Sequence, residues 1–220
     1  MNIYIEIIFL VALGALTSLS LPPTNLIFIN FITFSLFFLF LKKKFDQHKN
    51  FKLNFFYGWL FGFGYFSTNL YWISISLNFD QNYKYLIPIT IFIIPAFISI
   101  FYGLTSYLFS IIKPKKIVSS VLVFSLIFGC LEFIRGTILT GFPWNLIAYS
   151  FSNQLEVLSI TSIIGTYGFN LFCITLFTSP VILILKDSKK DLSFLIFILI
   201  ITLTFYFYGG NYQKKFYETK

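Results

Sequence analysis

Charged residues are scarce in this chain of 220 residues, where Asp, Glu, Lys and Arg together make up 11% of the sequence. Soluble domains carry about 25% charged residues, so a soluble fold is excluded. Disordered chains are poor in apolar residues, and the 57% hydrophobic content excludes disorder as well. The apolar residues stand in long unbroken runs rather than in the alternation of a membrane β-barrel. The composition therefore predicts an all-α, polytopic membrane protein.

Cysteine and histidine are also rare, and their positions argue against several chemistries. Cys130 and Cys173 fall inside apolar runs, at depths that differ by roughly 10 Å, whereas a disulfide joins Cα atoms about 7 Å apart or less. Neither has a nearby histidine or carboxylate that would make it a nucleophile, so we expect both to be small packing residues. His48, the single histidine, stands in a basic loop and is expected to be solvated. No metal or cofactor motif is present, and no cofactor is expected.

Seven apolar segments are long enough to cross a bilayer, whose hydrocarbon core of about 30 Å needs roughly 20 helical residues. They run over residues 3–21, 24–41, 55–78, 86–112, 117–137, 159–185 and 192–208. The first is expected to be a retained span, because no Lys or Arg precedes it and no convincing cleavage site follows it. The sequence thus predicts a transmembrane helical domain over residues 1–210 and a short external tail over residues 211–220.

Basic residues gather in the loops after the second, fourth and sixth segments, which alternate onto one face. These loops hold Lys42, Lys43, Lys44, Lys49, Lys52, Lys113, Lys115, Lys116, Lys186, Lys189 and Lys190, whereas the other face holds only Lys84, Arg135, Lys214, Lys215 and Lys220. Cytoplasmic loops carry an excess of Lys and Arg, so the N-terminus is predicted to be cytoplasmic and the C-terminus outside. Because these residues set topology, the net charge of +8 does not indicate nucleic acid, and no nucleic-acid partner is expected.

The first of three notable features on the predicted outer face is the pair Glu132 and Arg135. The two residues are three positions apart on one helical face and can form an ion pair. Charges at membrane depth are costly and usually functional, but a residue near a helix end can reach the interface cheaply. Two interpretations stay open: a structural ion pair or anchor, and a polar site for a lipid headgroup or substrate.

The second feature is the segment from Thr140 to Asn145, which continues to Tyr149 and Ser150. Its glycine and proline interrupt the helix, and non-helical backbone near a membrane must be shielded by protein or face water. Tryptophan and tyrosine suit the level of the lipid headgroups. One interpretation is a tight interfacial turn with aromatic anchors. The other is a re-entrant wall of a lipid-binding cleft, lined by Pro143, Trp144, Asn145 and Tyr149.

The third feature lies in the third segment, where Gly58 and Gly62 form a small-xxx-small face. Such a face lets two helices approach closely, and packing is the expected role of these glycines. Tyr71 and Trp72 follow towards the outer interface. They are expected either to belong to an aromatic belt or to line a pocket.

The order and spacing of these blocks resemble the membrane part of the apolipoprotein N-acyltransferase family. The resemblance is carried by residues 17–23 (TSLSLPP), by FGFGYF and NLYWISISL within residues 57–77, and by EFIRG, GFPWN and the Tyr149-Ser150 pair within residues 132–150. Residues 164–169 (IGTYGF) add a weaker fourth block. Ala148 departs from the family, which more often has glycine before the Tyr-Ser pair.

The resemblance implies a multi-pass protein of the bacterial inner membrane that acts in lipoprotein maturation. The family transfers an acyl chain from a membrane phospholipid, through a thioester, to the α-amino group of a diacylated lipoprotein. Its catalytic Glu, Lys and Cys lie in a nitrilase-like domain after the seventh span, and these 220 residues contain no match to that domain. We therefore expect no catalytic residue and no acyl transfer here, as in a truncated form or in a membrane half served by a separate nitrilase-like catalytic chain.

Two functions of other classes stay open beside this one. A non-catalytic lipid-binding or scaffold protein would share the aromatic outer face without needing a catalytic partner. A transporter would need access to both sides of the membrane in turn, which the scarcity of polar residues inside the apolar segments disfavours.

Overall fold

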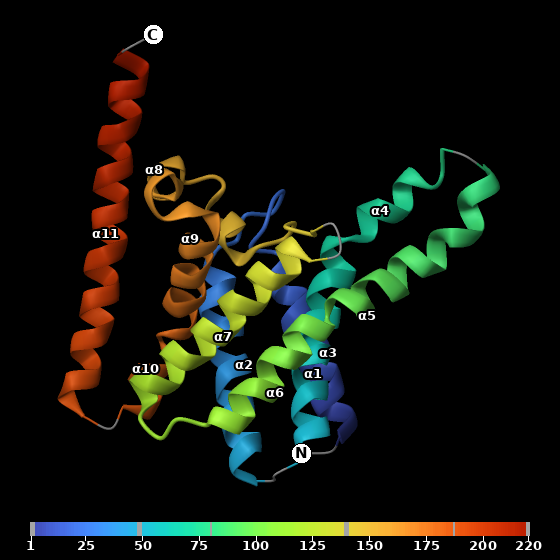
Figure 1. Cartoon of the computed structure of the whole chain (residues 1–220), viewed down its shortest axis with the longest axis horizontal. Helices are drawn as coiled ribbons and strands as arrows, with labels where there is room; N and C mark the ends of the chain where they lie inside the picture. Colours follow the sequence, from blue (N-terminus) through green and yellow to red (C-terminus); the bar gives the residue numbers. More distant parts are fainter. Residues whose placement is uncertain (1–2, 48–49, 80, 139–140, 187, 219–220) are drawn as a thin grey trace.

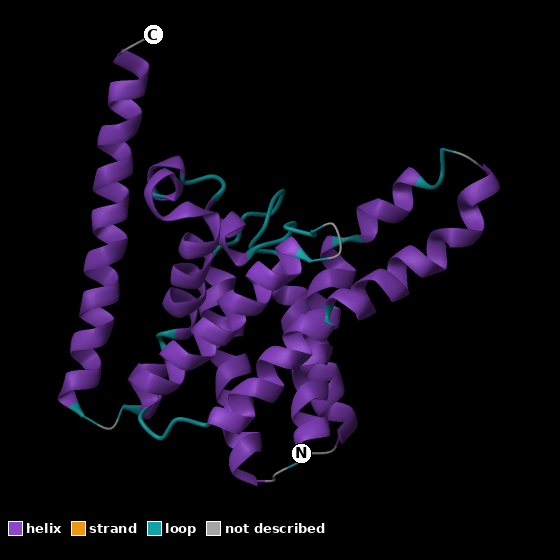
Figure 2. Ribbon diagram, in the orientation of Figure 1, coloured by secondary structure: helices purple, strands orange, loops and turns teal. Residues whose placement is uncertain are grey.

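The computed structural model describes residues 3–47, 50–79, 81–138, 141–186 and 188–218. These residues form helices and loops, as Figure 2 shows, and the all-α prediction is confirmed for them. His48, Lys49, Thr140 and Lys220 lie outside the described residues, so the predictions placed on them stay predictions.

The body of the molecule is a helical bundle with a core of aromatic rings (Figure 1). It is built from α1 (Ile3–Ser18), α2 (Phe28–Gln47), α3 (Phe51–Asn69), α6 (Ile100–Ile112), α7 (Ile117–Thr137) and α9 (Thr161–Thr178). Phe37 and Phe61 stack at the centre with their ring centroids 4.1 Å apart. Phe124 of α7 packs against Phe37, Phe128 packs against Phe124, and both rings are fully buried. Much of the aromatic content of the sequence thus fills the interior, where such rings contribute large buried areas.

Helix α3 lies between α1 and α6 and packs closely against both. A Cβ atom added to Gly58 would lie 2.2 Å from the carbonyl oxygen of Tyr102, and one added to Gly62 would lie 2.8 Å from the Tyr102 Cβ. Only glycine lets the α3 and α6 backbones approach this closely. The predicted packing role of these two glycines is therefore confirmed.

The predicted segments 55–78 and 86–112 are not single straight helices. Helix α3 begins at Phe51 and ends at Asn69, and Leu70 has a non-helical ψ of 4° before α4 (Tyr71–Ser76) starts. The chain then passes through a 3₁₀ turn (Gln81–Leu86) and a π-helical turn (Ile89–Ile93) into α5 (Ile94–Ile98). These elements form an arm that extends away from the bundle (Figure 1).

The predicted segment 159–185 is also interrupted. Gly165 adopts a φ of 71° inside α9, a left-handed conformation that breaks the regular helix. A second break follows α9 at Ser179 and Pro180, before the short α10 (Val181–Leu185). Proline lacks the N–H that would continue the hydrogen-bonding pattern. Before α9 lie the 3₁₀ turn η3 (Ile147–Phe151) and the short α8 (Leu155–Leu158).

Helix α11 (Lys189–Glu218) is a single long helix that stands beside the bundle (Figure 1). It runs past residue 208, where the seventh segment was predicted to end, so residues 211–218 continue the helix. The division into a membrane domain ending at residue 210 and an external tail stays a prediction.

Four helices among the described residues are long and apolar enough to cross a membrane: Ile89–Ile112, Ile117–Thr137, Thr161–Thr178 and Lys189–Lys215. Helix α1 is apolar but shorter. Helix α2 has three lysines and an aspartate in its last two turns. The count of seven spans therefore stays a prediction.

The two ends of the bundle differ in composition. The start of α1, the junctions α2–α3 and α10–α11 and the α6–α7 loop lie at one end of the molecule, at the bottom of Figure 1. We call it the basic end, because the lysines predicted to be cytoplasmic, apart from Lys49, stand in or beside these segments. The α1–α2 loop, the segment after α7 and the C-terminal end of α11 lie at the other end, which we call the loop end.

Candidate functional site

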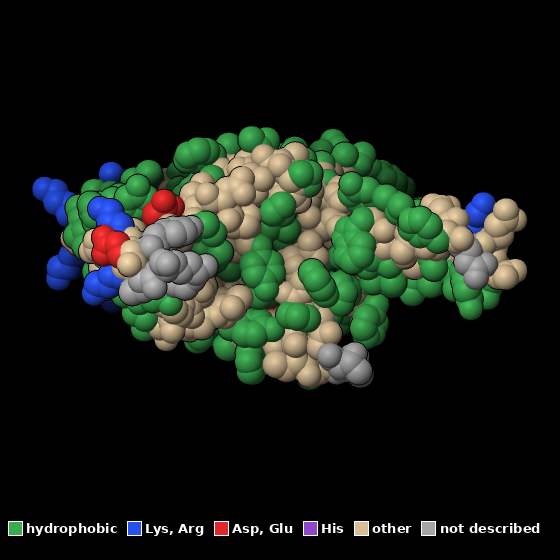
Figure 3. Space-filling model, turned by 90° about the horizontal axis from the view of Figure 1, so that it is seen from above, with side chains coloured by type: hydrophobic (Ala, Val, Ile, Leu, Met, Phe, Trp, Pro, Cys, Tyr) green, Lys and Arg blue, Asp and Glu red, His purple; other side chains and the backbone are tan. Residues whose placement is uncertain are grey.

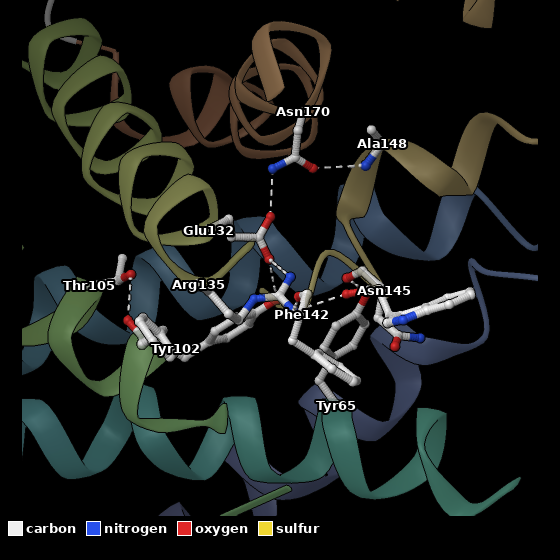
Figure 4. Close-up of polar contacts among 11 residues, drawn as sticks. Tyr65, Tyr102, Thr105, Glu132, Arg135, Phe142, Asn145, Ala148 and Asn170 are labelled. Atoms are coloured by element: carbon white, nitrogen blue, oxygen red, sulfur yellow. Dashed lines mark hydrogen bonds and ion pairs between the residues drawn. The ribbon is translucent and has the colours of Figure 1, made fainter. Parts of the chain in front are cut away.

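A buried ion pair lies beneath the loop end, formed by Glu132 and Arg135 of α7. Their side chains are each 1% exposed, and Arg135 Nη2 lies 3.3 Å from Glu132 Oε1. The same oxygen accepts a hydrogen bond of 3.0 Å from the Tyr102 hydroxyl of α6, and Glu132 Oε2 accepts one from the Asn170 amide of α9. Figure 4 shows these groups converging on the carboxylate. The pair therefore joins three helices.

Arg135 also holds the chain that follows α7. Its Nη1 donates to the carbonyl oxygens of Phe142 and Trp144, both at 2.9 Å (Figure 4). The Tyr65 hydroxyl of α3 donates to the carbonyl oxygen of Asn145, also at 2.9 Å. The segment 141–145 lacks regular secondary structure, so these bonds satisfy carbonyl groups that no helix satisfies.

Asn170 completes this support from the α9 side. Its Oδ1 accepts a hydrogen bond of 2.9 Å from the Ala148 backbone N–H, while its amide nitrogen donates to Glu132. Arg135 and Tyr65 thus hold the irregular segment itself, and Asn170 links the ion pair to the η3 turn that follows. The structure places Glu132 and Arg135 as buried supports of this segment, and a direct contact of either residue with a lipid headgroup stays a prediction.

Above this support lies a groove of about 540 Å³, which we call the aromatic groove. It is lined by Leu21, Pro22, Trp72, Pro143, Trp144, Asn145, Tyr149 and Ser152. The rings of Trp72 and Trp144 lie 6.4 Å apart at an interplanar angle of 65°. The structure therefore brings together five of the predicted site residues. Tyr71 is 58% exposed and lies at the start of α4, outside the lining of the groove.

Asn145 and Tyr149 supply polar groups at the aromatic groove. Asn145 has a φ of 58°, and its Oδ1 is buried without a hydrogen-bond partner among the described residues. Burial raises the pKa of the Tyr149 hydroxyl above its ordinary value, so this hydroxyl stays protonated at neutral pH. An asparagine with a buried, unsatisfied carbonyl oxygen and a tyrosine thus stand among the mainly apolar walls of the groove.

A second hollow of about 450 Å³, which we call the apolar cavity, lies between the arm and α7. It is lined by Ile73, Ile93, Ile94, Phe97, Ile98, Phe101, Arg135, Ile138, Gly141 and Phe142. Arg135 is the charged residue of this lining, and its Nε is buried without a hydrogen-bond partner among the described residues. Segment 141–145 therefore contributes walls to both hollows.

The loop end carries few charges between its edges. Viewed from above, charged side chains gather on the side of α11, and basic atoms also show at the tip of the arm (Figure 3). Between these edges the visible surface is mainly hydrophobic or uncharged (Figure 3). Such a surface suits contact with the interfacial region of a membrane.

Sequence reasoning gave no role in the site to three residues that build it: Tyr65, Tyr102 and Asn170. Each is a polar side chain inside an apolar helix, and that exception is the signal that marks functional or structural polar networks in membranes. Leu21 and Pro22 were noted only as part of a motif. The tertiary structure assigns them to the wall of the aromatic groove.

Both cysteines are free in the structure. Cys173 is buried, as expected for a packing residue. Cys130 is exposed on the surface of α7, so its predicted packing role is wrong. Periodicity inside an apolar helix does not reveal which face meets other helices, because lipid-facing and core-facing positions are equally apolar.

Comparison with known proteins identifies the family. Residues 13–179 match the family model of the apolipoprotein N-acyltransferase N-terminal domain. The chain belongs to this family. The matched residues include every group that supports the irregular segment and both hollows beside it. Together with the apolar helices, this membership indicates a bacterial membrane protein.

Individual relatives agree with the family match. The apolipoprotein N-acyltransferase of Rhodopseudomonas palustris is 34% identical over 174 residues, which cover 78% of this chain and 32% of the relative. That of Allorhizobium ampelinum is 27% identical over 186 residues, covering 82% of this chain and 35% of the relative. That of Rickettsia prowazekii is 37% identical over 124 residues, covering 56% of this chain and 25% of the relative. The chain spans about a third of the length of the first two relatives.

Proposed function

We propose that these residues form the membrane part of an apolipoprotein N-acyltransferase. In this reaction an acyl chain passes from a membrane phospholipid to the N-terminal amino group of a diacylated lipoprotein. The observation that carries the proposal is the pair of hollows beside segment 141–145, held open by the buried Glu132–Arg135 network. Membership of the family supports the assignment.

The chemistry of the two hollows fits the parts of a lipid. Ligand sites are mainly apolar with a few placed polar groups, and the apolar cavity offers isoleucine and phenylalanine side chains to an acyl chain. Arg135 Nε is buried at its wall without a hydrogen-bond partner among the described residues, and we propose that it donates to a phosphate or ester oxygen. In the aromatic groove, Asn145 Oδ1 can accept from an ammonium or amino group.

The proposed orientation puts the loop end on the outer face of the bacterial inner membrane. In this orientation the chain crosses the membrane seven times, with a cytoplasmic N-terminus and an external C-terminus. The support is that the lysine-rich junctions predicted on one face lie together at the basic end (Figure 1), since cytoplasmic loops are rich in Lys and Arg.

We further propose that acyl transfer needs a nitrilase-like catalytic domain in addition to these 220 residues. The thioester route requires an activated thiolate beside a general base. Cys173 is buried in the bundle and Cys130 lies on the surface of α7, and neither lines the aromatic groove or the apolar cavity.

A chimaera tests the proposal. Residues 13–179 replace the matching residues of the Rhodopseudomonas palustris relative, and transfer from a fluorescent phospholipid to a diacylated lipopeptide is measured. We expect turnover by the chimaera and none by the 220-residue chain. Trp144→Ala in the chimaera is expected to lower turnover about tenfold or more, because it removes a wall of the aromatic groove.

Phe56→Ala is the matched control, since Phe56 is a half-exposed aromatic residue of α3 that lines neither hollow. Equal effects of the two alanine variants would contradict the role of the groove. A folded chimaera that binds the phospholipid without turning it over would favour the non-catalytic lipid-binding function.

A further inference from the structure

The basic end contains a hollow that the proposed acyl transfer does not use. It has a volume of about 310 Å³ and lies where α2, α6 and α7 meet. Its lining comprises Lys42, Phe45, Asp46, Phe109, Lys113, Pro114, Lys115 and Ser120. We call it the lysine pocket. Three ammonium groups against one carboxylate leave it with an excess of positive charge.

The three consecutive lysines near the end of α2 lie in three different environments. Lys44 turns into the bundle and pairs with the buried carboxylate of Glu6. Lys43 is exposed and does not line the pocket, whereas Lys42 is partly buried and does. Successive residues of a helix point about 100° apart, so only one lysine of this run reaches the pocket.

Asp46, Lys113 and Lys115 are exposed, and defined contacts hold the walls of the pocket in place. Lys113 Nζ donates to the carbonyl oxygen of Phe45 at 2.7 Å and lies 2.8 Å from Asp46 Oδ1. These contacts tie the end of α6 to the end of α2. The Ser120 hydroxyl donates to the Pro114 carbonyl oxygen at 2.7 Å, which fixes the loop before α7. Asp46 is thereby engaged with Lys113, and among the described residues the ammonium groups of Lys42 and Lys115 form no ion pair and remain to meet an anion.

Phenylalanine forms the other half of the lining. Phe45 and Phe109 are buried, with ring centroids 5.8 Å apart. A hollow with an apolar floor and a cationic rim, at the end of membrane-spanning helices, matches an amphiphile with a negative headgroup. Basic pockets between transmembrane helices are suited to anionic lipid headgroups.

We propose that the lysine pocket binds the phosphate of an anionic phospholipid from the leaflet at the basic end. Lys42 and Lys115 contact the phosphate, and Phe45 and Phe109 contact the glycerol and the first acyl carbons. The site is separate from the two hollows of the loop end. It rests on the proposed function only for the assignment of this leaflet to the cytoplasmic side.

The test is native mass spectrometry of the purified full chain titrated with phosphatidylglycerol. We expect the double variant Lys42→Gln/Lys115→Gln to raise the Kd for this lipid about tenfold or more, because it removes both ammonium groups that meet the phosphate. The matched control is Lys43→Gln/Lys116→Gln, which removes the same charge from adjacent exposed positions outside the pocket. The Kd of the control variant is expected to stay within about twofold of the Kd of the unsubstituted chain.

Further binding measurements distinguish a phospholipid from free phosphate as the bound anion. Zwitterionic phosphatidylethanolamine is expected to bind more weakly than phosphatidylglycerol, and Lys42→Arg/Lys115→Arg is expected to keep the starting affinity. Equal losses in the pocket and control variants would overturn the proposal in favour of a diffuse basic surface. Displacement of the lipid by equimolar inorganic phosphate would overturn the lipid assignment. This experiment measures lipid binding and not acyl transfer. Its result can therefore be told apart from a failure of the acyltransferase proposal.

Discussion

At the scale of single residues, the Glu132–Arg135 pair decides how the irregular segment after α7 is held. A buried ion pair is tolerated when further hydrogen bonds satisfy both partners. Tyr102 and Asn170 supply these bonds to the carboxylate, and two backbone carbonyl groups supply them to the guanidinium. Removing one charge leaves the other buried and unpaired, which is a larger penalty than the pair's own contribution.

Glu132→Gln is therefore expected to lower the free energy of unfolding by about 3 kcal/mol. The measurement is a denaturing-detergent titration of the purified chain, followed by circular dichroism. The control is Asp46→Asn, which breaks the exposed pair with Lys113 and is expected to cost about 1 kcal/mol or less. Comparable losses in the two variants would show that the buried pair is not a structural support.

Arg135→Lys keeps the charge and is nevertheless expected to release the segment 141–145. A lysine ammonium group cannot reproduce the planar donors that reach two carbonyl groups and Glu132 together. Amide hydrogen exchange of residues 141–146 is expected to become at least about tenfold faster. The reason is that the free energy of local opening falls by roughly the net free energy of the lost hydrogen bonds. Thr137→Ala is the control, since among the described residues its hydroxyl bonds carbonyl groups of its own helix.

At the scale of elements, α11 is held to the rest of the molecule mainly through α8. A Cβ atom added to Gly209 would lie 1.7 Å from the carbonyl oxygen of Glu156, whereas Gly210 has nothing within 4 Å. Gln213 also donates to the Ser159 hydroxyl at 3.4 Å. The close approach of the α11 backbone to α8 therefore depends on one glycine of an adjacent pair.

Gly209→Leu is expected to separate α11 from α8, and Gly210→Leu is expected to leave the contact intact. The measurement is disulfide formation between cysteines introduced at Ser159 and Gln213, with Cys130 replaced by serine. Cross-linking should fall about tenfold or more only in the Gly209 variant, because its side chain has no space against the backbone. Equal cross-linking in both leucine variants would contradict this docking mode.

At the scale of the whole molecule, the proposed orientation rests on the difference between the two ends of the bundle. With an odd number of spans the termini lie on opposite sides of the membrane, and lysine density selects the cytoplasmic side. Cysteines introduced at Ser188 and Asn211 report on the two ends. In intact cells, a membrane-impermeant maleimide is expected to label Asn211→Cys and to leave Ser188→Cys unlabelled. The reverse pattern would invert the proposed topology.

The sequence alone determined the class of the protein and much of its organisation. Low charge and long apolar runs leave no stable alternative to membrane helices, because unsatisfied backbone groups are too costly in hydrocarbon. Local chemistry also revealed the helix-packing role of Gly58 and the broken backbone at Gly141 and Pro143. The candidate groove residues Trp72, Trp144, Asn145 and Tyr149 were visible because aromatic and polar side chains stand out between apolar runs.

Only the tertiary structure decided which of these residues meet. The partners of Glu132 come from helices 30 and 38 residues away along the chain, and such contacts leave no local periodicity. The exposure of Cys130 was hidden for a different reason. In a membrane helix, faces that meet lipid and faces that meet protein are both apolar, so side-chain hydrophobicity cannot tell them apart.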